Sequence, residues 1–185
     1  LENNAPNEVG IVMAGNIPFV GFHDLLSVLM AGHRAEAKLS SQERVLMNYL
    51  INNLKEIEAD FDISLPDKLK NSDAIIATGS DNSARYFEYY FKGKPNIIRK
   101  NRTSVAILTG EESPEEIMLL AKDVFSYYGL GCRNVSKIYH PADLDLSGIL
   151  QHFESFQEVA NHNKYRNNYD YNKSILLVNG VDHLD

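Results

Sequence analysis

The sequence contains a single cysteine, Cys132, and therefore cannot form a disulfide within the chain. This suits a reducing compartment. Long apolar runs are also missing, since none approaches the roughly 20 residues that span a bilayer. The chain also begins without the basic-then-apolar leader of a secreted protein. We therefore expect a cytoplasmic protein with no membrane partner.

Basic residues are fewer than acidic residues in this sequence. Lysine and arginine number 18 against 25 aspartates and glutamates, which gives a formal net charge of -7 at pH 7. Nucleic-acid binders usually carry a concentrated basic face, so we expect no nucleic-acid partner. The six histidines lack metal-ligand spacing to one another and to Cys132. The sequence therefore predicts no metal site.

What the chain does have is ordinary globular composition, with 44% hydrophobic and 23% charged residues among 185. That length supports one domain or two small lobes. The first residue is Leu1, and a strand-like run begins as early as Val9. We expect the chain to be a piece of a longer protein.

Apolar runs and helical periodicities alternate through the first hundred residues. Strands are expected at 9–14, 35–39, 73–77 and 96–99. A helix is expected at 22–32, and another at 83–91 after a cap at Asp81 or Asn82. A long helix is expected to follow a cap at Ser40 or Ser41, because apolar residues then repeat with helical period: Val45, Leu46, Tyr49, Leu50 and Leu54. This alternation predicts an α/β fold with a mostly parallel, doubly wound sheet.

The character of the sequence changes after Arg102. Strands are expected at 104–108 and 135–139. Between them we expect a helix that starts at Ser113-Pro114-Glu115-Glu116 and runs to Tyr128. We interpret 162–173 as an ordered loop and 174–179 as a strand. The chain is therefore divided into residues 1–101 and residues 102–185, the latter being part of a second α/β lobe.

Cys132 is the first candidate for chemistry. A thiolate is strongly nucleophilic and leaves well from a thioester, which suits acyl transfer. It follows Gly129-Leu130-Gly131, where missing side chains let a carbonyl approach the backbone and the Cys132 N–H. The alternative is a small buried hydrophobe, and local context leaves the two interpretations level.

Two further candidates follow predicted strands. Asn16 lies at the edge where parallel sheets bind ligands, and its amide can donate to an oxyanion; the alternative is a turn residue that bonds its own backbone. Thr78-Gly79-Ser80 precedes a helix whose N–H groups can hold phosphate. A plain strand-to-helix turn explains that tripeptide equally well. The basic cluster of Arg99, Lys100 and Arg102 is interpreted as a solvated face, with a phosphate contact as the alternative.

These pieces, in this order, resemble the aldehyde dehydrogenase superfamily, and more closely its acyl-CoA reductase branch, typified by the fatty acid reductases of bacterial bioluminescence. Four motifs carry the resemblance: Gly15-Asn16-Ile17-Pro18-Phe19, Lys38-Leu39-Ser40-Ser41, Thr78-Gly79-Ser80 and Gly129-Leu130-Gly131-Cys132. They are similar to the family's Pro-Trp-Asn turn, its Lys-Pro-Ser-Glu, its Thr-Gly-Ser and its nucleophile loop. Each is weak alone, and their common order is what favours the family.

The resemblance implies a fold and a set of roles. Residues 1–101 would be the NAD(P)-binding, Rossmann-like part, and residues 102–185 part of the catalytic cysteine domain. Cys132 would be the nucleophile, Asn16 the oxyanion donor, Lys38 and Ser41 ribose contacts, and Thr78, Gly79 and Ser80 pyrophosphate contacts. The substrate would be an acyl-CoA or acyl-protein thioester and the product a fatty aldehyde, made without a metal. The full-length protein would be a homo-oligomer.

Two departures from the family pattern bear on the reaction. Oxidising members carry a general-base Glu before the cysteine, whereas no Asp or Glu occurs here between Glu88 and Glu111. Without a base, hydrolysis of an acyl-enzyme loses a factor of about 10²–10⁴, which favours reduction. Ser41 stands where the family has a Glu that would repel a 2′-phosphate, so NADPH is preferred over NADH. The alternatives are an NAD-dependent aldehyde dehydrogenase and an inert nucleotide-binding module.

Overall fold

The computed structural model describes residues 5–181. The chain divides into two compact units, residues 1–101 and residues 102–185, and each is described by itself.

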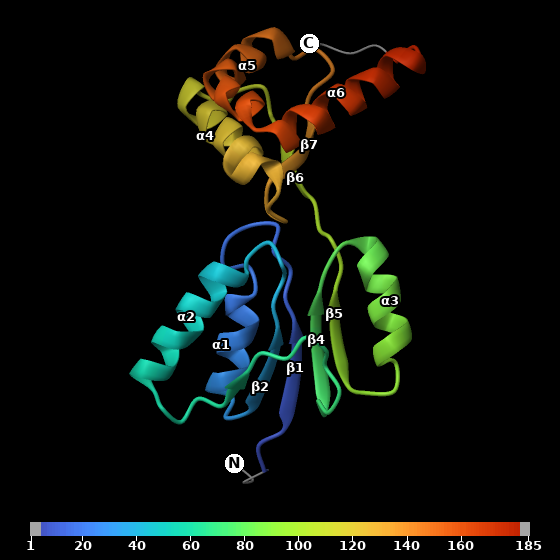
Figure 1. The fold of residues 1–185 in the computed structure, drawn as a ribbon. Helices are drawn as coiled ribbons and strands as arrows, with labels where there is room; N and C mark the ends of the chain where they lie inside the picture. Colours follow the sequence, from blue (N-terminus) through green and yellow to red (C-terminus); the bar gives the residue numbers. More distant parts are fainter. Residues whose placement is uncertain (1–4, 182–185) are drawn as a thin grey trace. The chain divides into compact units, whose positions relative to one another are not determined.

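A five-stranded parallel sheet forms the centre of the first unit (Figure 1). Its strands are β1 (Glu8–Val12), β2 (Arg34–Lys38), β3 (Ile63–Ser64), β4 (Ala74–Thr78) and β5 (Asn96–Arg99). They lie in the order β3-β2-β1-β4-β5, so the chain moves outward from β1 first in one direction and then in the other. All the carboxyl ends therefore meet at one edge of the sheet, the edge that binds ligands in doubly wound folds.

Helices cover both faces of this sheet. They are α1 (Phe22–Met30), α2 (Arg44–Ile57) and α3 (Asp81–Phe91). Figure 1 shows α1 and α2 on one face and α3 on the other. Alternate β1 residues such as Val9 and Ile11 pack into the core under α1 and α2, together with Leu25 and Met47. The doubly wound parallel sheet expected from the sequence is confirmed.

The buried face of α2 agrees only in part with the expected one, since Leu50 and Leu54 pack against the core as expected. Val45 and Tyr49 are exposed, at 81% and 69% of their surface, while Met47 and Ile51 are almost fully buried. The helix also begins at Arg44, with Glu43 at its N-cap and no side-chain cap, so neither Ser40 nor Ser41 caps it. Residues 41–43 form a turn before the helix begins.

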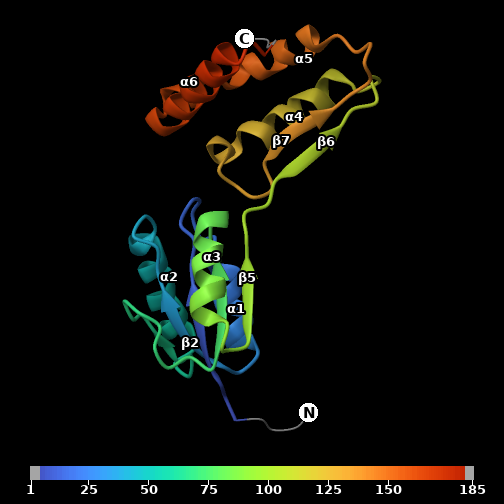
Figure 2. The same ribbon diagram turned by 90° about the vertical axis from the view of Figure 1, so that its right-hand side faces the viewer.

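The second unit contains a pair of parallel strands, β6 (Ser104–Ile107) and β7 (Val135–Tyr139), connected through α4 (Pro114–Phe125). Further elements follow: the 3-10 helices η1 (Ser126–Gly129) and η2 (Glu154–Asn161), and the helices α5 (Leu146–Phe153) and α6 (Asn163–Val178). Figure 2 shows α4 lying along the strand pair. Leu108, Ile117 and Ile149 form a small core, while Val105 and Ile107 on β6 stay 52% and 76% exposed.

The expected start of α4 is confirmed in detail. The Ser113 hydroxyl accepts from the Glu116 N–H, the Glu116 carboxylate accepts from the Ser113 N–H, and Pro114 occupies the first turn. The expectations for the last part of the chain are wrong. Residues 162–173 are not a loop and 174–179 are not a strand, because one helix, α6, runs through both.

Between residues 5 and 181 there is no helix with the length and apolarity needed to cross a membrane.

Candidate functional site

The candidate residues of the first unit all lie at the carboxyl edge of its sheet. Asn16 follows β1 and is exposed, Lys38 ends β2, and Ser41 follows β2. Thr78 ends β4, directly beside β1 in the sheet. The fold therefore brings all six predicted positions of this unit to one edge of the sheet, with Gly79 following Thr78 and Ser80 at the N-cap of α3.

The β1–α1 and β2–α2 loops touch at this edge. A Cβ built on Gly15 would lie 2.4 Å from the Ser40 Oγ, so only glycine allows the approach. The Met13 N–H also donates to the Lys38 carbonyl, at 3.1 Å. Close contact of these loops holds the backbone beside Asn16 against the segment that contains Lys38.

Glu43 provides a second connection between the same loops. Its Oε1 accepts a short hydrogen bond from the N–H of Phe19, a residue held in the left-handed region at φ 58°. Its Oε2 is buried and has no partner among the described residues. Desolvation raises the pKa of the Glu43 carboxyl, and the bond from Phe19 lowers it less. A buried acid thus fixes the turn that contains Asn16.

Glu43→Gln is expected to stabilise the protein at neutral and alkaline pH. Because the folded-state pKa is raised, the free energy of unfolding contributed by Glu43 is largest below about pH 4.5 and falls as the pH rises through the raised value. Glutamine keeps an acceptor for Phe19 without burying a charge, so we expect a gain of about 1 kcal/mol at alkaline pH and none in acid. Urea denaturation at several pH values measures this, with exposed Glu56→Gln on the same helix as control. A pH-independent gain would contradict the interpretation.

Thr78-Gly79-Ser80 forms a tight strand-to-helix turn. Ser80, not Asp81 or Asn82, caps α3, and its hydroxyl accepts from the Ser83 N–H at 3.3 Å. A Cβ on Gly79 would lie 2.9 Å from the Ser83 Cβ, so this glycine serves close packing of α3 on the strand end. The first-turn N–H groups of α3 have no intrahelical partners, as at every helix start. The structure therefore supports the interpretation as a packing turn, and phosphate binding at this helix start stays a prediction.

Arg99 and Lys100 each form an ion pair with a carboxylate on a helix, one on each face of the sheet. The Arg99 guanidinium forms a short ion pair with Asp24, whose side chain is only 7% exposed, on α1. The Lys100 ammonium lies 2.8 Å from Glu88 on α3. These pairs fasten the end of β5, which supports a structural role for the two basic residues.

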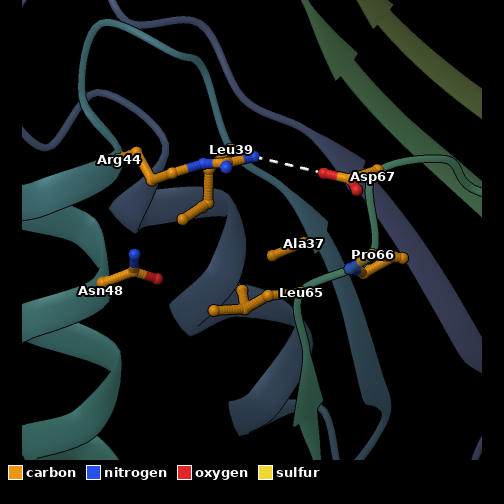
Figure 3. Close-up of a pocket in the computed structure, with 7 residues that line it drawn as sticks. All are labelled: Ala37, Leu39, Arg44, Asn48, Leu65, Pro66 and Asp67. Atoms are coloured by element: carbon orange, nitrogen blue, oxygen red, sulfur yellow. Dashed lines mark hydrogen bonds and ion pairs between the residues drawn. The ribbon is translucent and has the colours of Figure 1, made fainter.

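A hollow of about 220 Å³ lies at the ends of β2 and β3 (Figure 3). Its lining consists of Ala37, Leu39, Arg44, Asn48, Leu65, Pro66 and Asp67. Figure 3 shows the Arg44 side chain reaching across toward Asp67. Because whole-ligand sites usually measure about 300–1,000 Å³, this hollow suits one part of a larger ligand.

Cys132 lies in the second unit, in the turn between η1 and β7, and it is exposed. The alternative of a small buried hydrophobe is therefore wrong for this chain. Two tyrosines in the segment before it have left-handed backbones, with φ 52° at Tyr127 and 59° at Tyr128, followed by Gly129 at 70°. This conformation ends α4 at Phe125, short of the expected Tyr128.

Left-handed backbone costs a non-glycine residue roughly 1–2 kcal/mol, and such residues concentrate at functional sites. The surrounding contacts offset that cost here. The Tyr128 ring stacks on His162, with ring centroids 4.2 Å apart, and the His162 Nδ1 accepts from the Tyr165 N–H at the start of α6. The helix missed by the sequence thus supports the segment that leads to Cys132.

Asn134 holds the cysteine turn closed. Its side-chain oxygen accepts from the Gly131 N–H at 2.8 Å, and its amide donates to the carbonyls of Asp123 at 2.7 Å and Ser126 at 2.9 Å. The Asn134 N–H also donates to the Gly131 carbonyl. One side chain therefore ties the turn around Cys132 to the end of α4.

Sequence reasoning missed three residues of these sites: Glu43, Arg44 and Asn134. The available signal for Asn134 was its place two residues after the cysteine, since asparagine readily bonds nearby backbone. Glu43 and Arg44 resemble ordinary surface residues in the sequence. Within residues 5–181, no group of three or more His, Cys, Asp or Glu is arranged to hold a metal ion.

Comparison with known proteins gives one distant relative in sequence and many in structure. No family model matches the chain. The chain is 23% identical over 153 residues to a long-chain acyl-protein thioester reductase from Aliivibrio fischeri, an alignment that covers 71% of this chain and 31% of that protein. The chain therefore spans about a third of that relative's length.

Solved aldehyde dehydrogenases share the fold. The enzyme from Bartonella henselae matches 85% of this chain and 38% of its own length, with a TM-score of 0.69 and 14% identity. The enzyme from Mycobacterium tuberculosis, solved in complex with NAD+, matches 80% of this chain and 34% of its own, with a TM-score of 0.63 and 19% identity. The aldehyde dehydrogenase-like α/β fold and the resemblance to the superfamily's thioester-reducing branch are confirmed.

Proposed function

We propose that the protein containing this chain reduces an acyl-CoA or acyl-protein thioester to an aldehyde, through an acyl group carried on Cys132. The observation that carries the proposal is the exposed thiol of Cys132 on a turn fixed by Asn134 and by the backbone before it. The distant thioester reductase relative supports the substrate class. A coarser description, an aldehyde or acyl oxidoreductase, accommodates both the relative and the fold.

The first step is acyl transfer to sulfur. The Cys132 sulfur forms a bond to the thioester carbonyl carbon, and the bond from that carbon to the leaving thiol's sulfur breaks. The leaving thiol takes up the proton that the Cys132 thiol gave up. We assign the Asn16 amide and the Cys132 N–H as donors to the oxyanion that forms between these events. The product of this step is a thioester on Cys132.

The carboxyl edge of the first unit fits a nicotinamide dinucleotide. Its donor set consists of the Lys38 ammonium, the Ser41 hydroxyl and the turn from Thr78 to Ser80 at the start of α3. A reduced nicotinamide, when bound, supplies the hydride that converts the acyl group to the aldehyde level. Cys132 then leaves as a thiolate and recovers a proton from solvent. NADPH is the preferred cofactor because Ser41 places no negative charge against a 2′-phosphate.

The absence of acidic residues between Glu88 and Glu111 supports reduction over hydrolysis. With no general base from that stretch, water attack on the Cys132 thioester is slow. Cytoplasmic location, a homo-oligomeric whole protein and operation without a metal complete the proposal.

Mass spectrometry of the whole protein tests it. After mixing with an acyl-CoA in the absence of cofactor, we expect an acyl mass adduct on the peptide that contains Cys132. Adding NADPH should remove the adduct and release aldehyde. Release of carboxylic acid from an aldehyde with NAD+ would favour an aldehyde dehydrogenase instead. A thiol that neither acquires an adduct nor reacts with iodoacetamide faster than unfolded peptide would favour an inert nucleotide-binding module.

A further inference from the structure

The turn that contains Asn16 includes one residue with an unfavourable backbone conformation. Phe19 lies in the left-handed region, at φ 58°, which residues other than glycine rarely adopt. It is 42% exposed, so packing of its side chain offsets only part of the cost. Its carbonyl accepts from the Phe22 N–H at 3.0 Å, and its N–H donates to the Glu43 Oε1. These two backbone contacts therefore help to hold the residue in this conformation.

Glu43 is buried at a cost that the start of α2 does not explain. It is 5% exposed, and its Oε2 has no hydrogen-bond partner among the residues that the structure describes. Burial of a carboxyl with an unsatisfied oxygen is unfavourable, and desolvation raises the pKa of this group. Although Glu43 stands at the N-cap of α2, its side chain does not cap the helix. The carboxyl bonds the neighbouring loop instead, so its burial serves the turn at Phe19.

The two ends of the same turn are held by close packing of glycines. A Cβ on Gly15 would lie 2.4 Å from the Ser40 Oγ, and a Cβ on Gly21 would lie 2.6 Å from the Met13 side chain. Glu43 bonds the turn between these two points. Loss of its carboxyl would therefore release the middle of the turn while both ends stay packed.

We propose that Glu43 is a positioning residue for acyl transfer in this protein. Through the Phe19 N–H it holds the Asn16 amide at the place where the oxyanion forms, and it does not touch the thioester itself. The inference rests on the proposed function, in which Asn16 is one of two oxyanion donors. A donor displaced by about 1 Å stabilises the transition state less but leaves substrate binding unchanged. Glu43 therefore acts on the rate of acylation and not on the affinity for thioester.

A double-mutant cycle of Glu43 and Asn16 in the whole protein tests the proposal, with single-turnover acylation by a long-chain acyl-CoA as the measurement. We expect Glu43→Ala to slow acylation by about 10–100-fold at saturating acyl-CoA, and to leave the half-saturating concentration within about twofold. Asn16→Ala should slow it by about 10²–10³-fold, the range for one oxyanion donor. Because both residues act on one contact, the double variant should lie within about threefold of Asn16→Ala alone.

Glu43→Gln separates the hydrogen bond from the charge. Glutamine keeps an acceptor for the Phe19 N–H, so this variant should acylate within about threefold of the unchanged protein. Glu56→Ala is the matched control, because Glu56 is an exposed glutamate on α2 and its loss changes the net charge as Glu43→Ala does. It should acylate normally. Thermal melting of each variant confirms that it folds.

A second route displaces the same turn without changing Glu43, should Glu43→Ala fail to fold. In Gly15→Ala the new Cβ meets Ser40, so the turn must shift and acylation should slow. Adding Ser40→Gly removes the side chain that the Cβ meets and should restore acylation. This pair of variants tests whether the place of the turn sets the rate.

The inference would be overturned by normal acylation in Glu43→Ala or Gly15→Ala. It would also be overturned if the losses from Glu43→Ala and Asn16→Ala multiplied in the double variant, or if Glu43→Gln were as slow as Glu43→Ala. An unchanged protein that gains no acyl group on Cys132 would overturn the proposed function and this inference with it. An unchanged protein that acylates, together with any of the other results, would overturn this inference alone.

Discussion

Replacing Cys132 with alanine is expected to lower aldehyde formation by about 10⁴-fold or more, the scale seen when a covalent nucleophile is removed. The loss follows because no other thiol exists in the chain to carry the acyl group. Aldehyde release and NADPH consumption measure it at saturating thioester. The effect should appear in kcat, since the cofactor contacts that we propose do not include the Cys132 side chain.

Cys132→Ser is the matched control for packing, because it changes one atom. We expect serine to be nearly as inactive as alanine, with no acyl adduct and with cofactor affinity unchanged. An acyl adduct found elsewhere in the Cys132→Ala protein, with aldehyde still formed, would sink the assignment of the nucleophile.

Asn134→Ala should slow acyl transfer to Cys132 by about 10–100-fold, as expected when a reacting group loses its fixed position by about 1 Å. Alanine removes the acceptor for the Gly131 N–H and the donors to the Asp123 and Ser126 carbonyls. Single-turnover acylation at saturating thioester measures the change. The fall should lie in the rate of acylation and not in the affinity for thioester.

Asn134→Asp separates the two halves of this role. Aspartate keeps the acceptor for Gly131 but loses the donors to the end of α4, so an intermediate acylation rate is expected. Asn163→Ala, at the exposed start of α6, serves as control and should acylate normally. If Asn134→Ala acylated at the normal rate while melting at a lower temperature, Asn134 would be a structural residue only.

The sheet was predictable because its signal is local. Central parallel strands are short apolar runs bounded by turns, and β5 and β7 fall at the expected residues, Asn96–Arg99 and Val135–Tyr139. The face of α2 was only partly predictable from periodicity, because apolar residues surround most of this helix: Leu50 and Leu54 pack on the core as expected, whereas Met47 and Ile51 are buried in place of Val45 and Tyr49.

The helix α6 illustrates the opposite case. None of its sixteen residues is buried, so the sequence has no periodic apolar face that could indicate a helix. Its start depends on His162, whose ring accepts from Tyr165 and stacks on Tyr128, 34 residues earlier in the chain. Contacts between distant residues leave no pattern in a sequence.

The same contrast applies to the candidate site. The places of Asn16 and of the turns at the strand ends were predictable, because the strands that precede them can be derived from the sequence, while the chemical roles of Asn16 and Cys132 stay predictions. The side chains that hold them were not predictable. Asn134 bonds carbonyls 8 and 11 residues away, and Arg44 meets Asp67 across 23 residues. Residues this far apart in the sequence come into contact only when the helices and strands pack together.

Within residues 102–181 the second unit has one pair of parallel strands, β6 and β7, and this has a practical consequence for protein production. Two strands are too few to be stable by themselves, and β6 presents Val105 and Ile107 to solvent. Such an open apolar strand is a template for pairing between molecules. Expression of residues 102–185 alone should therefore yield inclusion bodies, whereas expression of a longer part of the protein that covers β6 should yield protein in the soluble fraction.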